Sequence, residues 1–361
     1  MSGYSCGSAT SLDNVVIPFQ HGGVSRRPTL HDVAAHAGVS IKTVSRVVNG
    51  SSAVSEPVRA RVAASVAELR YVPNSFARSL KSGGGDTIGV VMDSIADPFF
   101  ASLISAVESR ALEAGFTVIF GSTGSDPDRE RQQVERMAMQ RVRALILAPV
   151  TGDHSYLEQF RTTLPIVMVD RQVEIPGYDI VAVDDRGLTR SAVDHLIERG
   201  HRRIAFVGND VHFPTTARRL LGYRDALAAV SVEPDPAWYP EGRGDEDEAV
   251  ELVHRLLALP DPPTAFFTAN PRAGIGTVHA LHTSDRTDVA MVSFGDFPLA
   301  ATLSPAITCV NQDPHGIGVA ATERVLVHLD ARESERPDEP PRELIVDTEL
   351  VPRGSGELVP A

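Results

Sequence analysis

The chain has 361 residues, of which 42% are hydrophobic and 22% charged, and its formal net charge is −13. These values are typical of a globular protein with two or three domains. The sequence also excludes a transmembrane protein, because no apolar run approaches the ~18 residues that a membrane-spanning helix needs. The two cysteines, Cys6 and Cys309, are too few for a disulfide framework or a cysteine-built zinc site. Residues 1–27 lack the pattern of a secretory signal, so we expect a cytoplasmic protein.

The charge is distributed unevenly along the chain. Residues 25–82 hold nine Lys or Arg against three Asp or Glu, a surplus of six positive charges. The remainder of the chain carries the negative excess. A short basic segment joined to a large acidic one predicts that the basic segment binds a polyanion.

The N-terminal quarter predicts a disordered extension followed by short helices. Residues 1–27 show no periodicity, and we expect them to be disordered. Thr29 can cap a first helix, and Asp32 completes a capping box. Gly38 suits a turn because glycine tolerates a positive φ, and Ser40 can cap a second helix. The pattern favours a helix-turn-helix, in which the second helix meets base edges; a plain helical hairpin remains the alternative.

From Asp86 onward, apolar runs alternate with helical stretches. Fully apolar strands separated by helices predict parallel sheets that are covered on both faces. About 260 residues exceed what one such sheet usually carries, so two doubly wound lobes are expected, with a ligand beyond the carboxyl ends of the strands. The expected strands are Thr87–Met92, Thr117–Phe120, Ala144–Ala148, Ile166–Val169, Ile204–Val207, Ala265–Thr268 and Val289–Val292.

No motif for catalysis stands out in the sequence. There is no Walker loop, no HExxH pair and no GxSxG elbow. His279 and His282 could share a helix face, but two half-exposed helix histidines are the simpler interpretation. Gly274 and Gly276 follow a strand, yet the third glycine of a dinucleotide fingerprint is missing. We therefore expect no catalytic residue, no metal and no cofactor.

Several motifs occur in the order found in one known family. TLHDVAAHAGVSIKTVSRVVNG (29–50) is followed by YVPNSFARSLKSGGGDTIGVV (71–91), ADPFFASL (96–103), HLIERGHRRIAFVG (195–208), RRLLGY (218–223) and Thr308–Gln312. Over residues 28–354 the chain resembles the lactose-repressor (LacI/GalR) family of transcription factors. The resemblance implies an all-α helix-turn-helix headpiece and an α/β, two-lobed periplasmic-binding-protein-like domain with two doubly wound parallel sheets.

The resemblance also implies a function and its partners. The expected function is sequence-specific repression of transcription by a homodimer on a palindromic double-stranded DNA operator. A small-molecule effector, a carbohydrate or related metabolite, would bind between the lobes. Two other classes of protein are possible on such a fold, an enzyme and a solute-binding protein. The chain shows no nucleophile–base pair, which argues against an enzyme. A solute-binding protein would not carry a basic headpiece.

The DNA contacts that the resemblance implies are of three kinds. Lys42 and Arg46 would donate to guanine, and Ile41 would contact a thymine methyl group. Ala77 and Leu80 belong to a short hinge helix, residues 74–80, where Leu80 would enter the minor groove and kink the duplex. The alternative for Leu80 is packing on the next domain. Phosphate contacts, which fix the register on DNA, are expected from Ser40, Thr43, Ser45 and Asn49. For Arg59 and Arg61, a solvated charge on the helix surface is at least as good an interpretation as a phosphate contact.

For the effector, the resemblance points to residues at strand ends. Arg219 matches a ligand-clamping arginine whose planar fork suits vicinal hydroxyls, a carboxylate or a phosphate. Gly295 stands where the family commonly has a ligand aspartate, so either the next residue, Asp296, takes that role or the contact is absent. Pro271 departs from a common Asp, and Trp238 precedes the usual place of a stacking aromatic. The expected effector residues are Phe99 (or helix core), Asp170, Arg219, Asn270, Asp296 and Gln312.

The predicted boundaries follow from these motifs. The extension covers 1–27, the headpiece 28–73, the hinge and linker 74–85, and the effector domain 86–361. Residues 86–184 and 313–341 are assigned to the first lobe, and residues 185–312 and 342–354 to the second. The segment LVPRGS (350–355) coincides with a protease-cleavage tag but is interpreted as native. No leucine-rich heptad follows it, so a tetramerising coiled coil is not expected.

Overall fold

The computed structural model describes residues 28–48, 53–71, 86–150, 152–173, 175–208, 211–234, 236–239, 245–334 and 340–360. The chain separates into two units, residues 1–78 and 79–361. Some predictions lie outside the described residues: the extension 1–27, the phosphate contact Asn49, and the hinge helix with Ala77 and Leu80.

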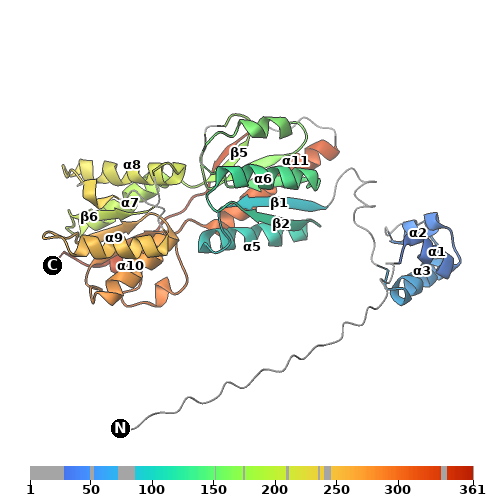
Figure 1. The fold of residues 1–361 in the computed structure, drawn as a ribbon, viewed down its shortest axis with the longest axis horizontal. Coiled ribbons are helices and arrows are strands. Elements are labelled where there is room, and N and C mark those ends of the chain that lie inside the picture. The colour runs from blue at the N-terminus through green and yellow to red at the C-terminus, as the bar shows by residue number, and fades with distance from the viewer. Residues whose placement is uncertain are drawn as a thin grey trace, which may run out of the picture. The chain divides into compact units, whose positions relative to one another are not determined.

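Within its described residues, the first unit has three helices, α1 (Leu30–Ala37), α2 (Ile41–Val48) and α3 (Glu56–Glu68) (Figure 1). The predicted capping box is present, since the Thr29 N–H donates to Asp32 Oδ2 at 2.7 Å and the Asp32 N–H donates to Thr29 Oγ1 at 3.3 Å. Gly38 ends α1 in the left-handed region at φ 64°. The helices enclose a small core that includes Val33, Val44, Val62 and Tyr71. The helix-turn-helix prediction is confirmed.

The first lobe of the second unit is a six-stranded parallel sheet with strand order β10-β5-β4-β3-β1-β2. Alternate residues point to opposite faces: Ile88 and Val90 pack with α5 and α11, whereas Val91 packs with α6. The strands are β1 (Thr87–Met92), β2 (Thr117–Ser122), β3 (Ala144–Leu147), β4 (Ile166–Val169), β5 (Asp179–Ala182) and β10 (Glu343–Ile345). The helices are α5 (Pro98–Glu113), α6 (Pro127–Met139) and α11 (Pro314–Glu333), with a 3-10 helix at Ser155–Phe160.

The second lobe is a five-stranded sheet with order β11-β9-β8-β7-β6, parallel except for β11. Helices α7 (Asp185–Glu198) and α8 (Pro214–Ala229) cover one face, and α9 (Glu246–Leu257) and α10 (Pro271–Thr283) cover the other. The strands are β6 (Ile204–Val207), β7 (Ala265–Thr268), β8 (Ala290–Phe294), β9 (Thr308–Val310) and β11 (Leu350–Val351), with 3-10 helices at Pro236–Trp238, Ala300–Thr302 and Ser355–Glu357. The two doubly wound lobes are as predicted.

One predicted lobe boundary is wrong. Residues 342–354 were assigned to the second lobe, but β10 pairs in parallel with β5 in the first lobe, with Glu343 opposite Ile180. The chain returns to the second lobe only at β11, which pairs with β9. Strands β5, β10 and β11 were not among the expected strands. They have two to four residues each, and β5 and β10 begin with an acidic residue, so none forms a clear apolar run.

The two glycines of the GxG motif serve helix packing. A Cβ on Gly276 would lie 2.3 Å from the carbonyl oxygen of Glu246, and one on Gly274 would lie 2.8 Å from the Phe297 ring. Gly276 therefore lets α10 approach α9 closely, and Gly274 leaves room for the Phe297 ring. His279 and His282 lie exposed on α10, and Trp238 packs beside the α9–α10 core.

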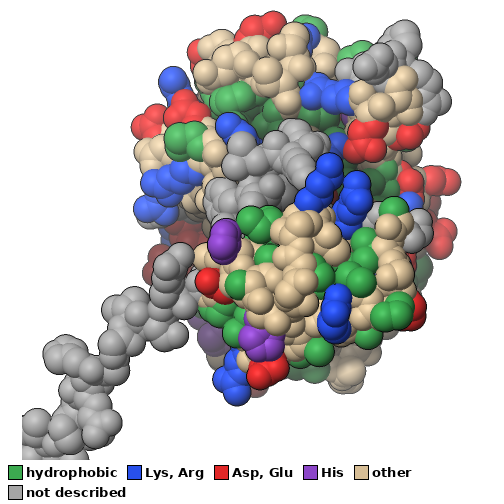
Figure 2. Space-filling model, turned by 90° about the vertical axis from the view of Figure 1, so that its right-hand side faces the viewer, with side chains coloured by type: hydrophobic (Ala, Val, Ile, Leu, Met, Phe, Trp, Pro, Cys, Tyr) green, Lys and Arg blue, Asp and Glu red, His purple; other side chains and the backbone are tan. Residues whose placement is uncertain are grey.

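The surface is mixed in character. Figure 2 shows Lys and Arg side chains interspersed with Asp, Glu and hydrophobic ones on the face that it presents. Among the helices that the structure describes, none has both the length and the apolar content needed to cross a membrane.

Candidate functional sites

The N-terminal part of α2 presents a polar surface to solvent. Ser40, Ile41, Lys42 and Arg46 are exposed, whereas Thr43 and Ser45 are half-buried. Ile41 is 46% exposed although it is apolar. Burial of Val44 against α1 and α3 fixes which face of α2 points outward. The base-reading positions predicted from the sequence therefore share one accessible surface.

The local contacts hold this surface in place. Ser40 Oγ accepts the Thr43 N–H at 3.1 Å, as predicted for an N-cap. His36 Nδ1 lies 3.0 Å from Ser65 Oγ and ties α1 to α3. Arg59 donates to the Val54 carbonyl at 3.4 Å and pairs with Glu56 at 3.5 Å, which favours the structural interpretation of this arginine.

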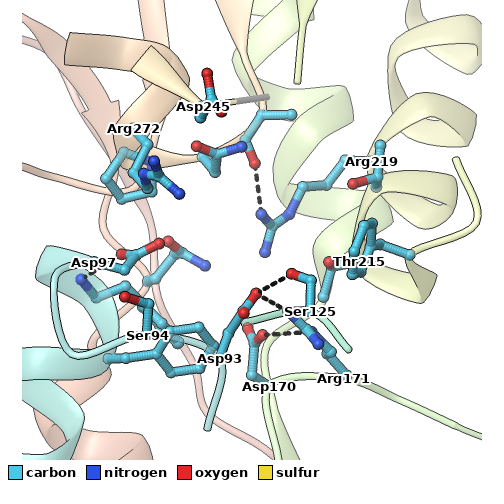
Figure 3. A pocket seen from close by; sticks show the side chains of 18 of the residues that line it. Asp93, Ser94, Asp97, Ser125, Asp170, Arg171, Thr215, Arg219, Asp245 and Arg272 are labelled. Carbon is cyan, nitrogen blue, oxygen red and sulfur yellow. Dashed lines mark hydrogen bonds and ion pairs between the residues drawn. The ribbon is translucent and has the colours of Figure 1, made fainter. Parts of the chain in front are cut away.

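In the second unit, a cavity of about 290 Å³ lies between the two lobes at the carboxyl ends of their strands. Five of the six predicted effector residues line it: Phe99, Asp170, Arg219, Asn270 and Gln312. Figure 3 shows side chains from both lobes around it, with Asp93, Ser94, Asp97, Asp170 and Arg171 on one side and Thr215, Arg219, Asp245 and Arg272 on the other.

Arg219 lies on α8 and is only 5% exposed. Its Nε donates to Asp185 Oδ1 at 2.7 Å, and its Nη1 donates to the Ala269 carbonyl at 2.6 Å. Its guanidinium carbon stands 3.9 Å from the centroid of the Phe294 ring. Burial raises the pKa of Asp185 to about 6, although the positive charge of Arg219 acts to lower it. Arg219 is therefore part of the cavity wall as well as a candidate ligand contact.

Asp170 follows β4 with its backbone in the left-handed region at φ 65°, which aspartate tolerates better than most residues. The side chain is 8% exposed. Burial raises the pKa of its carboxyl, while the guanidinium groups of Arg219 and Arg171 act in the opposite direction. The backbone conformation thus directs an acidic group into the cavity.

Phe99 satisfies both interpretations that the sequence left open. It lines the cavity, and it is also buried in the α5 core, where its ring centroid lies 5.1 Å from that of Phe100 in an edge-on arrangement. Asn270 caps α10, because its Oδ1 accepts the Ala273 N–H at 2.8 Å.

The sequence interpretation missed Arg171, which is 4% exposed on the cavity floor. Its Nη2 donates to Asp93 Oδ2 at 2.9 Å, and its Nη1 donates to the Pro149 carbonyl at 3.1 Å. Its guanidinium carbon lies 5.0 Å from the ring centroid of Phe213, which belongs to the other lobe. Arg171 lies two residues after the end of β4, and this position is the sequence signal that could have identified it as a cavity residue.

Among the further polar residues of the cavity that the sequence interpretation missed are Asp97, Asp245 and Arg272. Asp97 caps α5, since its Oδ1 accepts the Phe99 N–H at 2.9 Å, and Asp245 caps α9. Burial raises the pKa of Asp97 to about 6. Arg272 is half-buried in the first turn of α10. Two of the three are helix caps, so from the sequence alone they have a sufficient structural explanation.

Comparisons with known proteins agree with this architecture. A family model described as bacterial regulatory proteins, lacI family, matches residues 29–74, and a model of a periplasmic binding protein-like domain matches residues 193–356. The HTH-type transcriptional repressor PurR of Aliivibrio salmonicida is 30% identical over 313 residues, which cover 85% of this chain and 94% of the relative. The chain belongs to the lacI family.

Two further comparisons support membership of the lacI family. The ribose operon repressor of Escherichia coli is 31% identical over 308 residues, covering 83% of this chain and 92% of the relative. A crystal structure of the lac repressor dimer bound to operator and the anti-inducer ONPF has a TM-score of 0.79 at 27% identity, covering 92% of this chain and 99% of that one. The protein is thus a transcriptional regulator whose relatives are repressors.

Within the lacI family pattern, the departure at Gly295 has a steric explanation. Gly295 adopts φ 94°, and a Cβ there would lie 2.5 Å from Gln312 Oε1 and 2.8 Å from Pro271. The expectation that Asp296 replaces the missing aspartate is not supported by the geometry. Asp296 does not line the cavity, and both of its carboxylate oxygens accept hydrogen bonds from Arg353, at 2.9 and 2.6 Å.

Proposed function

We propose that the protein represses transcription by binding a palindromic operator as a homodimer, and that a small-molecule effector, a carbohydrate or related metabolite, controls this binding from the cavity between the lobes. The observation that carries the proposal is the combination of an exposed α2 N-terminus in one unit with a polar interlobe cavity in the other. The lac repressor structure, described as a dimer with operator and anti-inducer, supports the same combination.

In this proposal, α2 enters the major groove. Lys42 and Arg46 donate to guanine edges and Ile41 contacts a thymine methyl group. Ser40, Thr43, Ser45 and Asn49 contact phosphates, and Ala77 and Leu80 contact the minor groove.

The effector acts through the angle between the lobes. The cavity is lined by both lobes, so a ligand in it binds one lobe arrangement more tightly than another. The effector can shift the equilibrium between the lobe arrangements only by the difference in its affinity for them. Phe99, Asp170, Arg219, Asn270 and Gln312 are the proposed contacts.

The test is selection of DNA sites from a random library with the full-length protein, followed by a gel shift on the selected site. We expect a palindromic consensus, a complex with two protein chains by analytical ultracentrifugation, and loss of the consensus for a Lys42→Ala/Arg46→Ala double variant. Selection of no consensus, or of one that the double variant retains, would refute the proposal.

A further inference from the structure

A second cavity, of about 590 Å³, shares none of its described lining residues with the cavity at the strand ends. Its wall comes mainly from the segments of the first lobe that follow β3 and β4, and the second lobe adds His212 and Pro214. Much of this wall is apolar. The apolar side chains include Val150, Leu157, Val173, Ile175 and Pro214.

Gln172 gives this wall a hydrogen-bond acceptor that the chain does not use. The residue is 8% exposed, and its Nε2 donates to Glu343 Oε1 at 2.7 Å. A carboxylate accepts hydrogen bonds and does not donate them, so this contact fixes which end of the Gln172 amide is the NH₂ group. No residue that the structure describes donates to Gln172 Oε1. The wall therefore holds a fixed amide oxygen with free acceptor capacity.

His154 supplies a second acceptor. The residue is 9% exposed, and its Nε2 lies 3.4 Å from Glu130 Oε1. The Glu130 carboxyl group, which is buried, also accepts the Tyr156 O–H at 2.6 Å and the Val150 N–H. An acceptor facing Nε2 favours the tautomer with its proton on that nitrogen. Nδ1 is then the acceptor of the ring, and among the described residues none donates to it.

The charged side chains in the described wall are engaged by the chain itself. Arg161 donates to Glu158 Oε2 through Nε at 2.8 Å and through Nη2 at 2.6 Å, and Nη2 also donates to the Pro176 carbonyl at 3.1 Å. The Asp153 carboxylate accepts the N–H and the O–H of Ser155 at 2.8 and 2.7 Å. What this wall offers to a ligand is therefore apolar surface and two acceptors.

We propose that the second cavity binds an uncharged phenolic compound. The aromatic ring lies against Leu157, Val173 and Ile175, and hydroxyl groups donate to Gln172 Oε1 and His154 Nδ1. Burial of the ring is favourable, and a buried acceptor that gains a donor no longer carries the cost of desolvation. A cavity of this size suits a molecule of one or two rings. This site is separate from the effector cavity and from α2, so the inference goes beyond the proposed function.

The first test isolates the hydroxyl groups. The full-length protein is titrated by calorimetry with phenol, resorcinol and 2,7-dihydroxynaphthalene, each paired with the analogue in which fluorine replaces every hydroxyl group. The fluoro analogue keeps the ring and donates no hydrogen bond. We expect at least one of the three phenols to bind about 10-fold more tightly than its fluoro analogue, as the loss of one or two hydrogen bonds implies. Absence of binding by all three phenols, or equal affinity within each pair, overturns the proposal.

The second test concerns the charge of the ligand. Tyramine is a cationic phenol at neutral pH, and 4-hydroxybenzoate is an anionic one. Both keep the ring and a hydroxyl group, so they differ from the first panel chiefly in charge. We expect each to bind more weakly than the best uncharged phenol. Tighter binding of either compound shows that the cavity selects a charged ligand and overturns the proposal.

A pair of variants assigns binding to this cavity. Val173→Trp should abolish detectable binding, because the larger side chain fills the space that the ring occupies. Val359→Trp is the matched control, since Val359 is 67% exposed and lies outside the cavity, and it should leave affinity unchanged. Equal affinity of the two variants for the phenol shows that it binds elsewhere and overturns the assignment.

A third variant tests the acceptor without filling the cavity. Gln172→Met keeps the approximate shape of the side chain and removes Oε1. It should weaken binding of the phenol roughly 3- to 10-fold, as the loss of one hydrogen bond implies, and change binding of the fluoro analogue by less than about twofold. His154→Phe should act in the same way through loss of Nδ1. If neither variant narrows the preference for the phenol over its fluoro analogue, the recognition proposed here is wrong.

Discussion

At the scale of single residues, the same side chain can serve both folding and recognition. Asp97 caps α5 and lines the cavity, and Asn270 caps α10 and lines it from the other lobe. A cap fixes the side chain by a hydrogen bond to the backbone. The helix N-terminus thus positions a polar group at the carboxyl edge of each sheet.

The exposed face of α2 leads to a first prediction. Lys42→Ala and Arg46→Ala should each cost about 1–3 kcal/mol of operator affinity and relax specificity at particular bases. Arg59→Ala is the matched control, because Arg59 contacts Val54 and Glu56 in its own unit; it should weaken binding little and uniformly. The measurement is site selection followed by titration. An unchanged preferred operator for Lys42→Ala would show that α2 is oriented differently on DNA.

Arg219 leads to a second prediction, which concerns stability. Asp185 is 1% exposed and pairs with Arg219 at 2.7 Å. Arg219→Ala should lower the free energy of unfolding by about 3–5 kcal/mol, because it leaves a buried carboxylate without its guanidinium. In an Asp185→Asn/Arg219→Ala double variant the loss should be smaller than the sum of the two single losses. Urea unfolding of the four proteins tests this, and strictly additive losses would rule out the coupling.

At the scale of elements, the C-terminal segment is part of the second lobe. Leu350 and Val351 pair with β9, and Ser355 Oγ bridges the Thr308 N–H and the Met291 carbonyl at 2.9 and 2.6 Å. Glu357 accepts from Thr308 Oγ1 at 2.8 Å and lies 2.7 Å from His195 Nε2. The interpretation of LVPRGS as native is consistent with these contacts.

The third prediction follows from this packing. Thrombin, which cuts tags of this sequence after arginine, should not cut the native protein between Arg353 and Gly354, because a protease needs an extended and accessible segment. Cleavage should appear only when urea unfolds the second lobe. A peptide of residues 346–361 is the control and should be cut readily. Rapid cleavage of the native protein would show that the segment detaches.

Asp179, at the start of β5, joins three elements and gives a fourth prediction. It is 2% exposed and accepts from Arg324 at 2.8 Å, His328 at 2.7 Å and the Arg342 N–H at 2.6 Å. Burial alone would raise its pKa, but these hydrogen bonds and the Arg324 charge outweigh burial and lower the pKa to about 2.

A lowered pKa in the folded state stabilises the protein above the unfolded pKa of about 4, and this contribution is lost as the pH falls toward 2. Asp179→Asn should therefore reduce the free energy of unfolding by roughly 2–3 kcal/mol at pH 7. The difference from the unsubstituted protein should shrink below pH 4. Chemical denaturation at pH 7 and pH 3 measures both differences. Equal differences at the two pH values would contradict the assignment.

At the scale of the whole molecule, charge separates the two functions. Residues 25–82, which include the headpiece and the segments that flank it, carry a surplus of six positive charges in a chain of net charge −13. An acidic remainder is expected to repel DNA, which favours the basic part as the proposed DNA-binding surface.

The fifth prediction is that operator affinity depends steeply on salt. With about 6–10 phosphate contacts in a dimer, affinity should fall roughly 10³- to 10⁵-fold between 50 and 200 mM salt. A flat salt profile on the selected operator would exclude the headpiece as the DNA-binding part.

The sequence by itself determined the features that are encoded within a few neighbouring residues. The Thr29–Asp32 capping box, the turn at Gly38 and the apolar runs of β1, β4, β6 and β7 all follow from local propensity and periodicity. The family resemblance, rather than local periodicity, predicts the five candidate effector residues that line the cavity. Parallel strands bring their carboxyl ends to the edge where that cavity lies.

Only the tertiary structure decided which distant groups meet. Arg219 pairs with Asp185 and donates to the Ala269 carbonyl, and β10 joins β5 across more than 160 residues. Asp296 pairs with Arg353 and does not line the cavity. The charge balance of the cavity depends on these pairings. Coulombic and hydrogen-bond energies depend on the distances between atoms in space. For segments far apart in the sequence, tertiary packing sets these distances, and the number of residues between the segments does not predict them.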